Sequence, residues 1–212
     1  MKVTAIQHWD SVYERGDNWS DLEPSEYVVD IAPQLKSGDT ILDIGCGTGR
    51  NALYLARLGF NVEAFDVSAA AIKSLQKTSS QHKLKNLVSY QADYCYWQRR
   101  DRFDLVLLHG VLNSIPSELL PELLQYTRKR INYGGRIFIS VFHPLPGEAA
   151  IQGVNLHHDV ESKFIQEKAF YGYETVRHDI RIFSHSHGDL TSHSHCIERF
   201  LFQKPNLIPV NA

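Results

Sequence analysis

Three glycines at alternate positions form the part of this sequence best suited to hold a small ligand. Gly45, Gly47 and Gly49 follow a buried-strand pattern and precede a helix pattern, so backbone amides and a helix N-terminus would face the ligand. A dinucleotide-binding loop has glycine at its first, third and sixth positions, but Arg50 stands at the sixth. The absence of a following Gly-Lys-Ser/Thr excludes a phosphate-binding Walker loop. Asp43, two residues before the turn, would repel a pyrophosphate and attract a ligand ammonium.

Two further acidic residues stand at the ends of later strand patterns. Asp66 follows residues 61–65, and Asp93 follows residues 87–90. Acidic residues at the ends of three consecutive strands, together with the glycine spacing, resemble the class I methyltransferases. That family binds S-adenosylmethionine and releases S-adenosylhomocysteine, so the resemblance implies this cofactor for the chain.

The resemblance also implies a role for individual residues. The glycine loop would pass along the methionine part of the cofactor. Asp66 would accept both ribose hydroxyls, and Asp93 would accept the adenine amino group. The cofactor-binding residues that the resemblance implies are Trp9, Tyr13, Asp43, Gly45, Cys46, Gly47, Gly49, Asn51, Asp66, Val67, Asp93, Tyr94, His109 and Gly110.

Two segments are similar to the tellurite-resistance (TehB-like) methyltransferases. They are residues 49–56 and the sequence Trp-Asp-Ser-Val-Tyr at residues 9–13, which matches a motif that covers the cofactor in that family. The resemblance implies an aromatic lid of Trp9 and Tyr13 over the sulfonium, and core packing is the alternative. In that family a His-Arg pair in a hairpin turn handles an oxyanion substrate. His185 matches the histidine, and Ser186 stands in place of the arginine.

Three residues are candidates for catalysis: His143, Tyr13 and His185. His143 follows the fifth strand pattern, and the ordinary imidazole pKa near 6.5 suits proton removal at neutral pH. Its alternative is a loop histidine bonded to the backbone. A base is needed for a hydroxyl acceptor but not for a thiolate or a chalcogen oxyanion. We therefore expect in-line methyl transfer to a small molecule through a chalcogen oxyanion, a thiol or a hydroxyl.

Four histidines near the end of the chain could share one face of a hairpin. If His187 opposes His193, then His185 opposes His195, and four imidazoles are available to zinc or nickel. If residues 188–189 form a two-residue turn, the two pairs lie on opposite faces. No cysteine or carboxylate accompanies them at a fixed spacing, so we expect a solvated or substrate-facing surface and no metal.

Composition limits the classes of partner. The chain has 212 residues and a formal net charge of -2, which disfavours sequence-independent binding to nucleic acid. Residues 1–10 lack the apolar run of a signal peptide, and no stretch has the ~20 apolar residues of a membrane helix. The three cysteines are scattered, which disfavours a disulfide framework. We expect a single cytoplasmic domain over residues 1–212, present as a monomer or homodimer without a membrane partner.

Alternating strand and helix patterns predict an α/β fold. We expect a doubly wound, Rossmann-like sandwich whose seven-stranded, mostly parallel sheet ends in a C-terminal antiparallel hairpin. The expected parallel strands are Thr40–Ile44 and residues 61–65, 87–90, 103–108 and 136–142, and the hairpin strands are residues 173–183 and 192–202. Residues 1–35 would form a helical cap, and residues 143–172 an irregular insertion on the substrate side. Gly134 and Gly135 would end a helix over residues 116–131. Gly59 would end a helix over residues 51–58 as a left-handed stop, and Ser68 would cap a helix that runs to about residue 81.

Other functions remain open at this stage. A protein or peptide methyltransferase would use residues 152–168 as a docking surface. A non-catalytic module would bind S-adenosylmethionine without turnover. A nicotinamide oxidoreductase is a third alternative, which the spacing at Arg50 disfavours. A nucleic-acid methyltransferase would carry Asn/Asp-Pro-Pro-Tyr after the fourth strand, where His109 and Gly110 stand instead.

Overall fold

The computed structural model describes residues 3–15, 23–94, 101–143, 162–185 and 193–206. The chain divides into two compact units, Met1–Leu107 and Leu108–Ala212. Each unit is described by itself below. The expectation of one domain over the whole chain stays a prediction.

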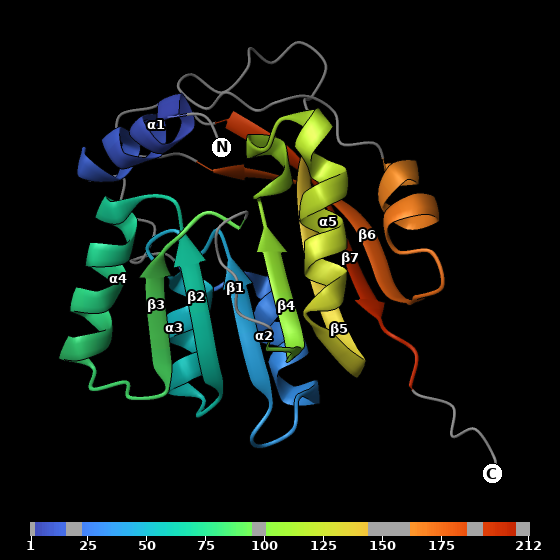
Figure 1. Cartoon of the computed structure of the whole chain (residues 1–212), viewed down its shortest axis with the longest axis horizontal. Coiled ribbons are helices and arrows are strands. Elements are labelled where there is room, and N and C mark those ends of the chain that lie inside the picture. Colours follow the sequence, from blue (N-terminus) through green and yellow to red (C-terminus); the bar gives the residue numbers. More distant parts are fainter. Residues whose placement is uncertain (1–2, 16–22, 95–100, 144–161, 186–192, 207–212) are drawn as a thin grey trace. The chain divides into compact units, whose positions relative to one another are not determined.

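Seven strands form one mixed sheet in the order β3-β2-β1-β4-β5-β7-β6 (Figure 1). Their bounds are β1 Thr40–Ile44, β2 Asn61–Asp66, β3 Leu87–Gln91, β4 Phe103–His109, β5 Ile131–His143, β6 Glu174–His185 and β7 His193–Gln203. β1 pairs in parallel with β2 and β4, and β2 pairs in parallel with β3. β7 lies between β5 and β6 and is antiparallel to both. The sequence prediction of a Rossmann-like sheet with a C-terminal antiparallel hairpin is confirmed.

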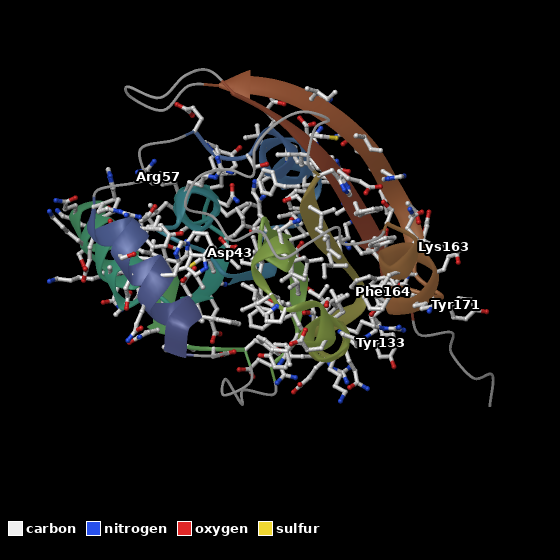
Figure 2. All side chains as sticks on the ribbon, turned by 90° about the horizontal axis from the view of Figure 1, so that it is seen from above. Asp43, Arg57, Tyr133, Lys163, Phe164 and Tyr171 are labelled. Atoms are coloured by element: carbon white, nitrogen blue, oxygen red, sulfur yellow. The ribbon has the colours of Figure 1, made fainter. Side chains whose placement is uncertain are left out.

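Helices cover both faces of the strands in the first unit. They are α1 Val3–Glu14, α2 Glu26–Ile31, the short 3₁₀ turn η2 Ala32–Gln34, α3 Arg50–Arg57 and α4 Ala69–Gln81. In both views α2 and α3 lie on one face of the strands and α4 on the other (Figures 1 and 2). Ser68 caps α4 by accepting a hydrogen bond from the Ala71 amide at 3.1 Å, and Gly59 after α3 has φ +94°. The predicted cap and the predicted left-handed stop are therefore confirmed.

The second unit contains the 3₁₀ turns η3 Leu112–Ser114 and η4 Ser117–Leu119, helix α5 Leu120–Lys129 and the π-helical segment η5 Phe164–Ala169. Its core contains a series of stacked aromatic rings. Phe170 stacks on Phe202 at 5.0 Å between ring centroids, and Phe202 on Phe200 at 5.6 Å. All three rings are buried, and each such burial stabilises the fold by about 1.5–3 kcal/mol.

Two predictions about the second unit are wrong. β5 begins at Ile131, so Gly134 and Gly135 lie inside a strand and do not separate it from the helix. The Gly134 amide donates to the Lys204 carbonyl and the Lys204 amide to the Gly135 carbonyl, so backbone pairing continues through the glycines. The insertion over residues 143–172, which we expected to be irregular, contains η5, and the Arg128 guanidinium anchors η5 by donating to the Ala169 carbonyl at 2.8 Å.

Candidate functional site

The glycine loop of the first unit is tied to the end of β2. The amides of Gly45 and Cys46 donate to the Phe65 carbonyl at 2.8 and 3.1 Å. Gly45, Gly47 and Gly49 have φ of +66°, +54° and +90°, which side-chain-bearing residues rarely adopt. The spacing of the three glycines is therefore required by the backbone of the turn.

Asp66 connects the glycine loop to the start of α4. Its Oδ2 accepts a hydrogen bond from the Gly47 amide at 2.8 Å, and its Oδ1 accepts one from the Ser68 amide at 2.9 Å. Burial raises the pKa of Asp66, and the hydrogen bonds from Ser68, Gly47 and Val67 act in the opposite direction. The carboxylate is thus held in one orientation at the end of β2, where the resemblance implies a ribose acceptor.

Asp43 is the second buried carboxylate of the first unit. Figure 2 shows it enclosed by neighbouring side chains, whereas Arg57 extends outward. Burial and the nearby Asp66 raise the pKa of Asp43 to about 7, and Arg50 partly offsets this. Burial also lowers the pKa of Arg50, while Asp43 and Tyr13 favour its charged form. A ligand with a positive amine would relieve the desolvation of the Asp43 carboxylate.

Helix α1 lies against the glycine loop through Tyr13. A Cβ atom added to Gly47 would be 2.6 Å from the Tyr13 hydroxyl oxygen. The Trp9 and Tyr13 rings are 6.1 Å apart, so both members of the expected aromatic lid lie together. Burial and the neighbouring Asp66 raise the pKa of Tyr13 well above its ordinary value. Tyr13 therefore keeps its proton at neutral pH and is chemically a donor rather than a base.

The other cofactor-binding candidates of the first unit differ in their contacts. Asp93 and Tyr94 are buried after β3, as the prediction requires of an adenine pocket. The side-chain oxygen of Asn51 accepts a hydrogen bond from the Ser25 amide at 2.9 Å, so it holds the start of α2. Burial, followed by Asp66 and Asp43, raises the pKa of the Cys46 thiol, which stays protonated. The Val67 carbonyl accepts a hydrogen bond from the Gln91 amide group at 3.2 Å.

Sequence reasoning missed two polar groups near the loop. The Thr48 hydroxyl oxygen is buried and has no hydrogen-bond partner among the described residues. Asp10 accepts hydrogen bonds from the Ser68 hydroxyl at 2.6 Å and the Ala70 amide at 3.2 Å, which anchors α1 to α4. The Thr48 hydroxyl is free to bond a polar ligand, and the Asp66 carboxylate is fixed beside the glycine turn. Both groups fit the polar groups of S-adenosylmethionine.

In the second unit, the end of β4 is joined to β5. The His109 Nδ1 atom lies 2.6 Å from the Ser140 hydroxyl, and the Gly110 amide donates to the same oxygen at 2.9 Å. Gly110 has φ +70° and lies against the Phe142 ring, so a larger residue would be strained there. Ser140 thus fixes His109 and Gly110, two of the cofactor-binding residues that the resemblance implies.

His143 ends β5 beside a buried carboxylate that sequence reasoning missed. Its Nε2 atom lies 2.8 Å from the Glu198 Oε2 atom, and the His178 Nε2 atom lies 2.6 Å from Oε1. Residues 143, 178 and 198 are far apart in sequence. The only sequence signal for Glu198 is that side chains alternate between the two faces of β7, which places Glu198 on the same face as Phe200. Among the described residues no group of three or more His, Cys, Asp or Glu is arranged to hold a metal ion.

The terminal histidines have a register that neither alternative anticipated. His185 opposes His193, and His195 opposes Phe183. The expected pairing of His185 with His195 across the hairpin turn is therefore wrong. His187 and the turn itself lie outside the described residues, and the role of His185 stays a prediction.

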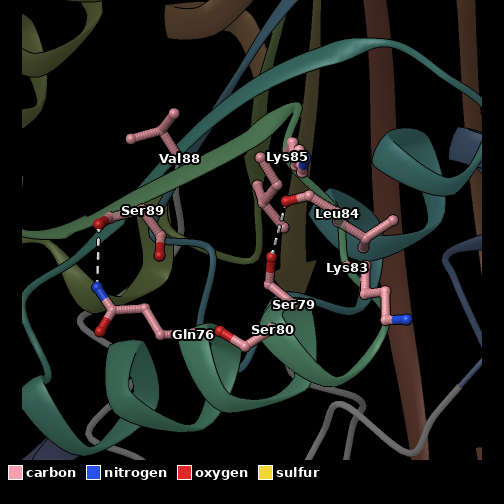
Figure 3. Close-up of a pocket in the computed structure, with 9 residues that line it drawn as sticks. Gln76, Ser79, Ser80, Lys83, Leu84, Lys85, Val88 and Ser89 are labelled. Atoms are coloured by element: carbon pink, nitrogen blue, oxygen red, sulfur yellow. Dashed lines mark hydrogen bonds between the residues drawn. The ribbon is translucent and has the colours of Figure 1, made fainter.

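A shallow depression of about 380 Å³ lies on the first unit between α4 and β3 (Figure 3). Gln76 donates to the Ser89 carbonyl at 3.2 Å and Ser79 to the Leu84 carbonyl at 3.3 Å across its floor. Its lining shares no residue with the glycine loop. Within the part of the chain that is described, no helix is both long and apolar enough to cross a membrane.

The sequence and fold match known proteins. The family described as "Tellurite resistance protein TehB" matches residues 10–143. A probable S-adenosyl-L-methionine-dependent methyltransferase TehB from Haemophilus influenzae is 31% identical over 108 residues, which are 51% of this chain and 37% of that protein. The chain therefore spans well under two thirds of that relative.

Two crystal structures share the fold. TehB from Haemophilus influenzae has a TM-score of 0.74 at 20% identity and covers 93% of this chain and 67% of its own. A Burkholderia thailandensis 1,6-didemethyltoxoflavin-N1-methyltransferase has a TM-score of 0.71 at 18% identity and covers 96% of this chain and 89% of its own. Since the family match spans more than half of the sequence, the chain belongs to the TehB family and has the fold of class I S-adenosylmethionine-dependent methyltransferases.

Proposed function

We propose that this chain transfers the methyl group of S-adenosylmethionine to a small-molecule acceptor. The observation that carries the proposal is Asp66, whose two carboxylate oxygens accept hydrogen bonds from the Gly47 and Ser68 amides. This arrangement fixes an anionic acceptor beside a glycine turn in the first unit. TehB family membership supports the same donor.

Residues of the first unit would hold the cofactor. Asp66 would accept the ribose hydroxyls, Asp93 the adenine amino group, and Asp43 would attract the methionine ammonium. Trp9 and Tyr13 would shield the sulfonium from water. When bound, S-adenosylmethionine supplies an electrophilic methyl group on a positively charged sulfur. The protein's main task is then to position the acceptor, which can lower the barrier by ~7–11 kcal/mol.

Two observations support a small-molecule acceptor: the net charge of the protein and the ligand of a protein with a similar fold. The net charge of -2 offers no excess of positive charge for nucleic acid. The Burkholderia thailandensis relative in the comparison holds 1,6-didemethyltoxoflavin, a small molecule, together with S-adenosylhomocysteine. Among the catalytic candidates, His143 would accept a proton, Tyr13 would donate a hydrogen bond, and His185 would contact the acceptor. The cytoplasmic location stays a prediction.

Isothermal titration with S-adenosylmethionine and with NADH tests the donor. We expect S-adenosylmethionine alone to bind. Asp66→Ala removes a charged acceptor whose hydrogen bonds contribute ~1.5–3 kcal/mol each, so affinity should fall by roughly 100-fold or more. The exposed Asp30→Ala variant is the matched control and should bind as the wild type does. Binding of NADH instead, or equal affinity of the Asp66→Ala variant, would refute the proposal.

A further inference from the structure

Glu198 lies between two imidazoles in the second unit. Its side chain is 2% exposed, while those of His143 and His178 are 24% and 34% exposed. His143 lies within hydrogen-bond distance of one carboxylate oxygen and His178 of the other. The Ser162 hydroxyl donates a third hydrogen bond to the oxygen that His143 contacts. Strands β5, β6 and β7 and Ser162, two residues before η5, thus converge on one buried carboxylate.

The charge of Glu198 determines which ring nitrogen carries the proton. Burial raises the pKa of Glu198, but the hydrogen bonds from Ser162, His178 and His143 outweigh it and lower the pKa overall. An ionised carboxylate only accepts hydrogen bonds, so both Nε2 atoms must donate. In a neutral imidazole whose Nε2 carries the proton, Nδ1 is the basic nitrogen. Both histidines therefore present Nδ1 as a proton acceptor.

The surrounding residues hold both rings in place. The His178 ring stacks on Phe200 at 4.6 Å with a 5° angle between the planes. His143 pairs with Cys196 in the β5–β7 register. The preceding residue, Phe142, exchanges two 2.8 Å hydrogen bonds between its backbone and the Asn113 side chain. This rigidity is what a catalytic base requires and what a solvated surface histidine lacks.

Few other charged or titratable groups face the two imidazoles. Cys196 shares their face of the sheet, and burial together with Glu198 raises the pKa of its thiol, which stays neutral. Asp179 and Arg199 alternate with His178 and Glu198 along β6 and β7, so they lie on the opposite face. Glu198 is thus the charge in direct contact with both His143 and His178.

We propose that Glu198 is a positioning residue that holds His143, with His178 beside it, as a base for an acceptor hydroxyl. The inference rests on the proposed methyltransferase function and narrows its acceptor to a protic nucleophile. The acceptor oxygen bonds to the methyl carbon as the carbon–sulfur bond breaks, and sulfur keeps the electron pair. The hydroxyl proton goes to the Nδ1 atom of His143, and Glu198 stabilises the resulting imidazolium. A thiolate acceptor would need none of these residues.

Long-range proton–nitrogen NMR of the histidine rings tests the positioning role without any substrate. We expect His143 and His178 to carry their proton on Nε2 in the wild type. Glu198→Gln keeps the shape but replaces one accepting oxygen by a donating amide, so at least one of the two rings should change tautomer. Ser162→Ala leaves both imidazole contacts in place and should preserve the tautomers. A proton on Nδ1 in the wild type, or unchanged tautomers of both rings in Glu198→Gln, would overturn the assignment.

Methylation of phenol and thiophenol tests the acceptor class. At about pH 8 thiophenol is largely ionised and phenol is not, so only phenol needs a base. We expect Glu198→Gln to lower kcat for phenol by roughly 100-fold, to shift its pH–rate profile, and to leave thiophenol unaffected. The exposed Glu167→Gln variant is the control and should match the wild type with both. The inference would be contradicted if Glu198→Gln lowered kcat equally for both acceptors. It would also be contradicted if the wild-type protein methylated thiophenol but not phenol.

Calorimetric binding separates the two failures. If S-adenosylmethionine does not bind, the proposed function itself is wrong. If it binds with wild-type affinity to Glu198→Gln but the tautomers and the phenol reaction are unaffected, only the role of Glu198 is wrong.

Discussion

Asp10 accepts a 2.6 Å hydrogen bond from the Ser68 hydroxyl, and this contact joins the N-terminal helix to the start of α4. The same Ser68 oxygen accepts a hydrogen bond from the Ala71 amide, and the Ser68 amide donates a hydrogen bond to the Asp66 carboxylate. One serine therefore links α1, the start of α4 and the proposed ribose acceptor. The aspartate of the Trp-Asp-x-x-Tyr motif thus has a structural role, which is to hold the aromatic residues over the glycine loop.

Removing the Asp10 carboxylate should weaken cofactor binding. Asp10→Ala loses two hydrogen bonds that keep α1 in place, worth together on the order of 1–2 kcal/mol. We expect S-adenosylmethionine affinity measured by calorimetry to fall about 5- to 30-fold, mainly through faster dissociation in stopped-flow experiments. Glu14→Ala, an exposed change on the same helix, should bind as the wild type does. Unchanged dissociation from Asp10→Ala would argue against a lid.

A methyl group at Gly47 should displace Tyr13. The added Cβ would be 2.6 Å from the Tyr13 hydroxyl and the backbone has φ +54°, so Gly47→Ala combines a collision with backbone strain. Gly59→Ala, with φ +94° and no atom within 4 Å, carries the strain alone and should cost about 1 kcal/mol in urea unfolding. We expect a larger loss for Gly47→Ala, partly restored by Tyr13→Ala in the double mutant. Additive losses would show that the two residues do not touch.

Stability should fall as pH rises through the range in which Asp43 titrates. In the folded protein burial raises the pKa of Asp43 from 3.8 to about 7, so the folded state keeps a proton that the unfolded chain releases. The contribution is complete below about pH 4 and is lost by about pH 7, at ~1.4 kcal/mol per pH unit. Urea unfolding between pH 5 and 8 should therefore give a flatter curve for Asp43→Asn than for the wild type. If unfolding free energy changed with pH equally in both proteins, the pH dependence would come from a group other than Asp43.

Asp179 should stabilise the hairpin through Arg199. The Arg199 guanidinium donates to both Asp179 oxygens at 2.8 and 3.0 Å, and the Arg199 side chain is 9% exposed. Asp179→Asn removes the carboxylate charge from this bidentate pair and should lower the unfolding free energy by about 1–3 kcal/mol. The Lys163–Glu167 pair is 77% and 63% exposed at 3.9 Å, so Glu167→Gln should change stability little. Equal effects of the two changes would contradict this difference.

Local sequence signals predicted the first unit well. The strand at Thr40–Ile44 and the cap at Ser68 agree with the structure because a buried parallel strand and a helix N-terminus each leave a local pattern. The same local reasoning failed at Gly134 and Gly135, which resemble a helix stop. Their pairing with Lys204, about seventy residues later, keeps them within β5, and no local pattern records it.

The sequence by itself determined the residues proposed to hold the methyl donor. Asp43, the three glycines and Asp66 are spaced along the chain by the length of one strand–helix–strand repeat. Tertiary structure alone decided the proposed acceptor side. Glu198, His143 and His178 meet because β7 inserts between β5 and β6, and the register of an antiparallel pair is set by packing over many residues. Their separation in the chain carries no periodic signal, so only the folded sheet shows that a carboxylate and two imidazoles share one face.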